Sequence, residues 1–291
     1  MIELFQALWN MMPSTFMIAS PILIAATGGL VCERAGVVNI ALEGLMVLGA
    51  VTAAISVSHF GLPIPAAMLA AAIVGGAFSL IHAFAAVTLR ADQVISGAGI
   101  NLLSLGLAVF VCQLLFAMDR TPPHRGMMRG DILGLFPTAW LALAVLAVTA
   151  FALYGRPWGL RLRAAGENPQ ALEAAGVNVS HMRYAAVIIS GLLAGLAGGG
   201  VVLTQDIQFT TSTINGTGFI ALAAVSFGRW LPLGILGSSL LFGMATALAV
   251  NFVNIPALRD LFPSEFFSMM PYLITLVALV VFKGRGRATF P

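Results

Sequence analysis

Long apolar runs separated by short polar segments make up most of this chain. Runs near the length that crosses a bilayer as a helix, about 20 residues, lie at 13–31, 40–58, 62–89, 97–118, 134–154, 184–204, 215–229, 231–252 and 267–283. The pattern predicts an all-α polytopic membrane protein with about nine transmembrane helices, within a range of eight to ten. We read residues 1–291 as a single transmembrane domain, in which the seventh run is short and rich in Gly and Ala.

Composition supports this class and excludes several functions. The chain is 59% hydrophobic and 9% charged, whereas soluble domains carry about a quarter charged residues. The only lysine, Lys283, is followed by Gly284, but a phosphate-binding loop needs Lys followed by Ser or Thr. Cys32, Cys112 and the four scattered histidines lack metal-ligand spacing. We therefore expect no metal site and no enzyme activity, and ATP-driven work would fall to a separate subunit.

Arginine placement predicts the orientation. Basic residues crowd two segments, the loop 155–183 and the tail after 282, which marks both as cytoplasmic by the positive-inside rule. The chain is then a multi-pass protein of the cell inner membrane with a cytoplasmic C-terminus and an external N-terminus. No basic residue precedes Arg34, so we expect the first run to remain as a span. Three arginines in the loop 119–133 argue mildly against its external position.

Two similar strings raise the question of an internal repeat. Ile-Ala-Leu occurs at 40–42 and at 220–222, and each is followed by a Leu-Pro that begins the next run. One interpretation is a pair of inverted repeats of four spans, 13–118 and 184–284, joined by a fifth span at 134–154 and the loop 155–183. The other is chance similarity between Ala- and Leu-rich sequences. The sequence leaves both open.

Several polar residues interrupt the apolar runs. Glu43 lies about one turn inside the second run, where a carboxylate costs several kcal/mol unless it finds a partner or water. Asn39 is four residues earlier, on the same helical face, so we expect the two side chains to share a polar environment. One interpretation of Glu43 is an interfacial carboxylate that pairs with Arg34 or with a helix start. The other is a residue that lines a route. Asn101 follows a glycine-punctuated break, and we expect it to face the interior.

The segment after the sixth run is also unusual. A short run entered through Gly-Thr-Gly at 216–218 indicates a discontinuous helix, which transporters place around a substrate path. An external loop with helix-capping residues is the alternative. Phe219 can stack on a planar solute or face lipid. The candidate pathway residues are therefore Asn39, Glu43, Asn101, Thr217, Phe219 and Ser226.

The loop 155–183 contains a predicted helix of about two turns. Asn168 can cap it, Pro169 suits its first position, and Gly176 can end it in a left-handed turn. Such a helix is too short and polar to span, so it should lie at the cytoplasmic face. Composition alone favours a local link between spans over a protein-binding element.

A family resemblance changes that balance. The string GLRLRAAGENPQALEAAGVNVSHMRY at 159–184, followed by the small-residue span 190–199, resembles the permeases of ABC importers for branched-chain amino acids, ribose-type sugars and nucleosides. In that family the Gly-Glu-Asn-Pro segment and the next helix form the coupling element that seats in the ATP-binding subunit. The resemblance assigns this role to Gly166, Glu167, Asn168, Pro169, Ala171, Ala175 and Gly176.

The string CERAGVVNIALEG at 32–44 is more specific. It resembles the shorter of two permeases in nucleoside and simple-sugar importers that use a basic-membrane-protein-type binding lipoprotein. The resemblance implies a subunit that translocates nucleosides or nucleobases by alternating access. Its partners would be an ATPase that holds the ATP and Mg, a longer homologous permease in a heterodimer and an extracytoplasmic solute-binding protein. This chain would bind no cofactor and no nucleic acid.

Two alternatives stay open. The solute could be a sugar or a branched-chain amino acid. A proton-coupled secondary transporter, with Glu43 or Asp92 as the proton carrier, is the alternative from another class. The Arg-flanked coupling helix favours the ABC permease, because a proton-coupled carrier does not need it.

Overall fold

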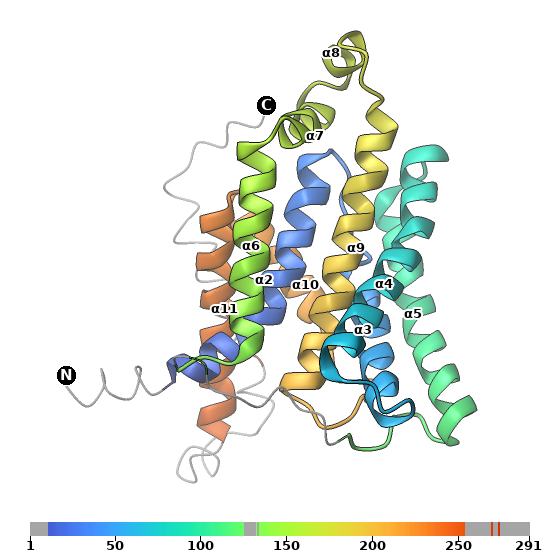
Figure 1. The fold of residues 1–291 in the computed structure, drawn as a ribbon, viewed down its shortest axis with the longest axis vertical. Coiled ribbons are helices and arrows are strands. Elements are labelled where there is room, and N and C mark those ends of the chain that lie inside the picture. The colour runs from blue at the N-terminus through green and yellow to red at the C-terminus, as the bar shows by residue number, and fades with distance from the viewer. Residues whose placement is uncertain (1–10, 125–131, 133, 254–268, 270–272, 274–291) are drawn as a thin grey trace, which may run out of the picture.

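The computed structural model describes residues 11–124, 132, 134–253, 269 and 273, and this part of the chain is helical (Figure 1). Six helices are long and apolar enough to cross a membrane. They are α2 (Met12–Arg34), α4 (Ile64–Ala83) with its π-helical extension η1 (Phe84–Thr88), α5 (Gln93–Phe116), α6 (Pro137–Gly155), α9 (Val179–Thr204) and α11 (Pro232–Val253). Two shorter apolar helices are α3 (Leu42–Ser58) and α10 (Thr217–Phe227).

These eight helices coincide with the first eight predicted runs, and the all-α polytopic membrane class is confirmed. The ninth run, 267–283, lies outside the described residues apart from 269 and 273. Two further helices, α7 (Pro157–Glu167) and α8 (Pro169–Ala174), lie together at one end of the bundle (Figure 1). We call this the α7–α8 end. The division into two repeats stays a prediction.

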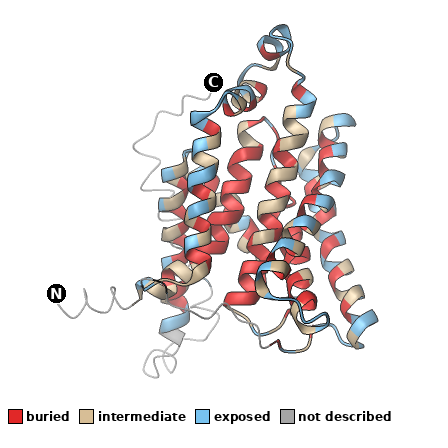
Figure 2. Cartoon of the chain, viewed as in Figure 1, coloured by how far each residue is buried: buried red, intermediate tan, exposed pale blue. Residues whose placement is uncertain are grey.

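The bundle is organised around α9. This helix packs against α2, α3 and α4, and both α2 and α9 are mostly buried, whereas α5 and α6 are mostly exposed (Figure 2). Apolar side chains such as Leu102 and Leu114 on α5 point outward with more than two thirds of their surface exposed. Exposure of this kind is expected where a helix faces lipid or another membrane subunit.

Glycines allow α9 to approach its neighbours closely. A side chain at Gly49 of α3 would collide with the backbone of Gly195, and one at Gly75 of α4 would collide with the carbonyl of Gly191. Helices associate in lipid mainly through such packing, because burial from water does not drive them together there.

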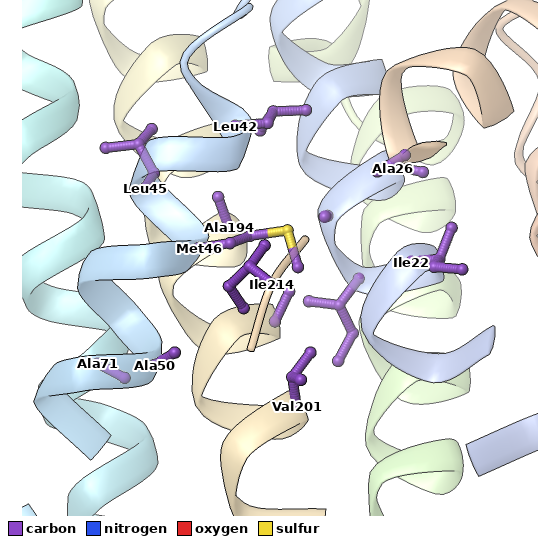
Figure 3. Packing of buried hydrophobic residues seen from close by; sticks show 14 of the residues in the cluster. Ile22, Ala26, Leu42, Leu45, Met46, Ala50, Ala71, Ala194, Val201 and Ile214 are labelled. Carbon is purple, nitrogen blue, oxygen red and sulfur yellow. The ribbon is translucent and has the colours of Figure 1, made fainter. Parts of the chain in front are cut away.

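The apolar core fills the space between these contacts. Figure 3 shows Met46 and Ala50 of α3 near Ala194 and Val201 of α9, with Ile214 of the segment before α10 among them. Met46 and Ala194 are fully buried. Ile214, two residues before Gly216, therefore packs inside the bundle, whereas its neighbours Ser212 and Asn215 are exposed.

Candidate functional site

The break between α2 and α3 is the first part of the site. Helix α2 ends at Arg34 and α3 begins at Leu42, and we call residues 35–41 the connector. Gly36 in the connector has φ +83°, a conformation that glycine adopts at little cost. The predicted placement of Asn39 on the helical face of Glu43 is therefore wrong, because Asn39 precedes the helix.

Side chains from other helices satisfy the connector's backbone. Val38 donates its N–H to the Gln93 carboxamide oxygen at 2.8 Å, and the Val38 carbonyl lies 3.1 Å from Nε2 of His82. Asn101 Nδ2 donates to the carbonyl of Ile40 at 3.0 Å. Non-helical backbone inside a membrane bundle requires such partners, because lipid offers none.

Asn39 is held inside the protein. Its side chain is fully buried and its Nδ2 donates to Oγ of Ser190 on α9 at 2.9 Å. This contact joins the connector to the central helix. Among the six candidate pathway residues, Asn39 is thus the one that is fully buried.

The carboxylate of Glu43 caps the start of α10. It lies in the first turn of α3, and its two oxygens accept N–H groups of Gly216 and Gly218, each at 2.7 Å. Helix starts present unpaired N–H groups and a partial positive charge, so a carboxylate is a favourable partner. Of the predicted interpretations, pairing with a helix start is what the structure has, and a role in lining a route stays a prediction.

Glycines make that capping contact possible. Gly216 has φ +87°, and a Cβ at Gly218 would lie 2.5 Å from the Cα of Glu43. The first turns of α3 and α10 therefore touch through their backbones. The Gly-Thr-Gly string indicated a discontinuous helix, and the short α10 that follows Gly216 agrees with it.

Asn101 of α5 holds the start of α3 in the same way. Its Oδ1 accepts the N–H of Gly44 at 2.8 Å while its Nδ2 binds Ile40 across the break. Consequently α5 caps α3 and α3 caps α10. We call Glu43, Asn101 and the N–H groups of Gly44, Gly216 and Gly218 the paired-start site.

The remaining pathway candidates lie on α10. Thr217 is partly buried and donates its hydroxyl to the carbonyl of Ile214. Phe219 and Ser226 are exposed and stand seven residues apart, which places them on one side of the helix. The structure therefore brings Glu43, Asn101 and Thr217 together at the helix starts and puts Phe219 and Ser226 on an accessible face.

Sequence reasoning missed the partners that satisfy the connector. His82, whose other ring nitrogen lies 3.1 Å from Oγ of Ser96, is fully buried in α4. Gln93 and Ser190 were missed as well. A buried polar residue inside an apolar run was the available hint, and it does not identify the partner.

The α7–α8 segment, residues 157–176, matches the local predictions in part. Asn168 Oδ1 accepts the N–H of Ala171 at 3.0 Å, Pro169 is the first residue of α8, and Gly176 has φ +78°. Helix α7 was not predicted as a separate element. The role of this segment in coupling stays a prediction, with Glu167, Ala171 and Ala175 exposed.

This segment contacts the connector directly. Arg183 at the start of α9 donates to the carbonyls of Ala35 at 3.3 Å and Ala165 at 3.2 Å. A side chain at Gly166 would lie 2.5 Å from the carbonyl oxygen of Arg34. Backbone of the α7–α8 segment is thus packed onto backbone of the connector. Within the described part of the chain, no group of three metal-ligating side chains occurs.

Comparison with known proteins gives several full-length relatives. The guanosine ABC transporter permease protein NupQ of Bacillus subtilis is 42% identical over 306 residues, covering 98% of this chain and 96% of that protein. The nucleoside ABC transporter permease protein NupC of Lactococcus lactis is 38% identical, covering 93% and 91%. The putative glucose ABC transporter permease protein TsgC13 of Haloferax volcanii is 31% identical, covering 93% and 90%.

A solved structure and a family model complete the comparison. PsaBC from Streptococcus pneumoniae in complex with Fab matches with a TM-score of 0.53 at 12% identity, covering 94% of this chain and 95% of that one, which is a likeness of fold. Residues 11–279 match the family model for the permease component of branched-chain amino acid transport systems. This chain therefore belongs to the family of branched-chain amino acid transport system permease components.

Proposed function

We propose that this chain is the membrane permease subunit of an ABC importer for nucleosides or nucleobases. The observation that carries the proposal is the 42% and 38% identity, over nearly the whole chain, to permeases named for guanosine and nucleoside transport. The subunit itself contributes the route and the coupling element. ATP and Mg would bind to a partner ATPase, and we assign no catalytic residue to this chain.

The exposed face of α10, with Phe219 and Ser226, suits an uncharged solute. The Glu43 carboxylate is engaged by two backbone N–H groups and Arg34 by the carbonyl of Trp230, so neither is free to neutralise a charged solute. Phe219, with 49% of its surface exposed, and Ser226 offer a ring and a hydroxyl. A nucleoside needs stacking and hydrogen bonds, whereas an amino acid brings two charges. A sugar lacks the planar base.

We place the route beside α3. This helix contacts both α5 and α10. Gly99 and Gly106 on α5 are exposed, and a Cβ added at either position would meet no atom within 4 Å. A second, homologous permease covering this face would enclose a route between the two subunits. Phe219 and Ser226 would touch the solute, while Glu43, Asn101 and Thr217 would hold the helix starts that form its wall.

The α7–α8 end is proposed to face the cytoplasm. Seven of the eight described arginines gather there, Arg120 being the exception, and the positive-inside rule assigns such an end to the cytoplasmic side. They are Arg34, Arg90, Arg156, Arg161, Arg163, Arg183 and Arg229. An ATPase would then seat on the exposed α8, and an extracytoplasmic binding protein would deliver solute at the opposite end.

Proton coupling through a carboxylate is less consistent with the geometry. Protonated Glu43 would turn an O–H toward an N–H donor and lose one of its two hydrogen bonds. Asp92 already caps α5 by accepting the N–H groups of Val94 and Ile95. Both carboxylates therefore have a capping role that their ionised form fulfils.

Uptake by the reconstituted complex in proteoliposomes tests the proposal. With ATP inside, we expect uptake of labelled guanosine but not of glucose or leucine, and no effect of collapsing the proton gradient. Uptake of leucine or glucose without nucleoside uptake would refute the substrate class. Uptake driven by a proton gradient without ATP would refute the transporter class.

A variant at Phe219 tests the solute contact. Phe219→Ala should raise the KM for guanosine about tenfold, since stacking of a base on an aromatic ring is worth about 1–3 kcal/mol. Phe84→Ala is the matched control, because Phe84 is similarly exposed but lies on η1. Equal KM values for the two variants would contradict the assignment of Phe219 to the route.

A further inference from the structure

One short stretch of chain holds α10 at both of its ends. Glu43 caps its start, as described above. Beyond its other end, Arg34 donates through Nε and Nη2 to the carbonyl of Trp230 at 3.2 and 2.8 Å. The indole N–H of Trp230 in turn donates to the carboxylate of Glu33. Residues 33–43 thus form hydrogen bonds both with the first N–H groups of α10 and with the turn that follows α10.

The backbone of that turn needs to be held. Arg229 and Trp230 both have φ +53°, a region that residues other than glycine rarely adopt. Such a conformation persists only where its surroundings fix it. The hydrogen bonds of Trp230 with Arg34 and Glu33 provide this restraint.

The same arginine also reaches the α7–α8 segment. Arg34 Nη1 lies 3.7 Å from the carboxylate of Glu167, and Gly166 packs against the carbonyl of Arg34. Arg183 ties Ala35 to Ala165 beside this contact. Arg34 is therefore bonded on one side to the turn that follows α10 and contacts on the other the segment expected to meet the ATPase.

We propose that Arg34 is a positioning residue that transmits movement from the α7–α8 segment to α10. In this inference, which rests on the proposed function, the α7–α8 segment, residues 33–43 and α10 move as one unit. A displacement of α8 by the ATPase then shifts α10 and carries Phe219 along the solute route. Solute access and ATP hydrolysis become linked through this unit.

The contacts differ in strength, which determines the expected phenotypes. The Arg34–Glu167 pair is partly exposed, with 24% and 54% of the two side chains accessible, and its atoms are 3.7 Å apart; water-accessible ion pairs contribute little. The two hydrogen bonds from Arg34 to a partly buried carbonyl are charge-assisted and stronger. Glu167→Gln should therefore change coupling less than twofold, and Arg34→Gln should change it strongly.

The first experiment measures ATP hydrolysed per solute imported by the complete complex. Arg34→Gln should raise this ratio about tenfold, as expected for loss of hydrogen bonds to a charged group, and Arg34→Lys should restore part of the coupling. Arg90→Gln is the matched control, an exposed arginine at the same end of the bundle. Trp230→Phe, which replaces the indole with a smaller ring that has no N–H and leaves the two bonds from Arg34 to the backbone carbonyl in place, should raise the ratio less. A ratio in Arg34→Gln equal to that of Arg90→Gln would overturn the proposal.

The second experiment needs ATP but no knowledge of the solute. Spin labels are placed on exposed positions of α8, α10 and α5 by Ala171→Cys, Ser226→Cys and Leu114→Cys, in a chain whose two buried cysteines are replaced by alanine. Distances are measured without nucleotide and with trapped ATP. Between these two states the distance from α8 to α10, measured between labels 171 and 226, should stay constant. The distance from α5 to α10, measured between labels 114 and 226, should change.

Arg34→Gln should reverse this pattern, so that the 171–226 distance changes and the 114–226 distance does not. Three results would overturn the proposal. The first is a 171–226 distance that changes in the labelled chain that keeps Arg34, and the second is the same pattern of distances with and without Arg34. The third is that neither distance changes when ATP is trapped. If the distances behave as expected but guanosine is not imported, only the proposed solute fails.

Discussion

Replacing Glu43 by Gln removes the charge at the start of α10 and leaves the side-chain volume nearly unchanged. A carboxylate accepts both N–H groups, from Gly216 and Gly218, with one oxygen each. A carboxamide has one oxygen and one NH2 group, so one of the two N–H donors must face another donor. The perturbation therefore breaks one contact and weakens the other.

The magnitude follows from these two contacts. A hydrogen bond to a charged group contributes about 1.5–3 kcal/mol, and a carboxylate at a helix start adds about 0.3–1 kcal/mol through the helix dipole. We expect Glu43→Gln to lower the free energy of unfolding by about 2–4 kcal/mol. Glu43→Ala, which loses both hydrogen bonds, should be at least as destabilising.

Equilibrium unfolding in mixed micelles of a mild detergent and SDS measures this difference. Glu173→Gln is the matched control, because Glu173 is exposed on α8, and its effect should stay within about 0.5 kcal/mol. Neutral hydrogen bonds between membrane helices average about 0.6 kcal/mol. A loss no greater than this for Glu43→Gln would refute the view that an ionised carboxylate holds α10.

Three further predictions concern packing, capping and pH. Gly198→Ala should lower the free energy of unfolding by about 1–3 kcal/mol in the same micelles, because its side chain would collide with the carbonyl of Met46. Asn168→Ala should destabilise α8 by about 1 kcal/mol through loss of its bond to Ala171, measurable as faster amide exchange there. Burial raises the pKa of Asp206, which follows α9, above its ordinary value of 3.8. The folded state then binds the proton more tightly, so stability should fall as pH rises from 3.8 through the raised pKa, and Asp206→Asn should remove that slope.

The helices that cross the bundle could be predicted from the sequence because the bilayer sets their length. The runs 13–31 and 231–252 differ from α2 and α11 by a few residues at most. Agreement is poorer where a helix leaves the apolar layer. Helix α9 begins at Val179, five residues before the predicted run at 184–204. Its first turn is polar, so hydropathy does not include that turn in the run. Helix α7 mixes arginines with apolar residues, and no membrane-length pattern reveals it.

The site was predictable only in part, since its contacts join residues far apart in the chain. Asn39 seemed a natural neighbour of Glu43 from four-residue spacing, yet it binds Ser190, 151 positions away. The helix had not begun at Asn39, and hydropathy does not mark that boundary. Capping by Asn168 was predictable because donor and acceptor lie three residues apart.

A more general rule follows from the paired-start site. A helix that starts within a membrane bundle has N–H donors that lack acceptors, and a carboxylate there has acceptors that lack donors. Neither is tolerated alone in lipid. This chain contains both, Glu43 inside one apolar run and Gly-Thr-Gly at the opening of a short one, and they meet. A helix start that needs acceptors and a carboxylate that needs donors, found in one apolar sequence, are therefore evidence that the two segments contact each other. This holds here although 173 positions separate Glu43 from Gly216.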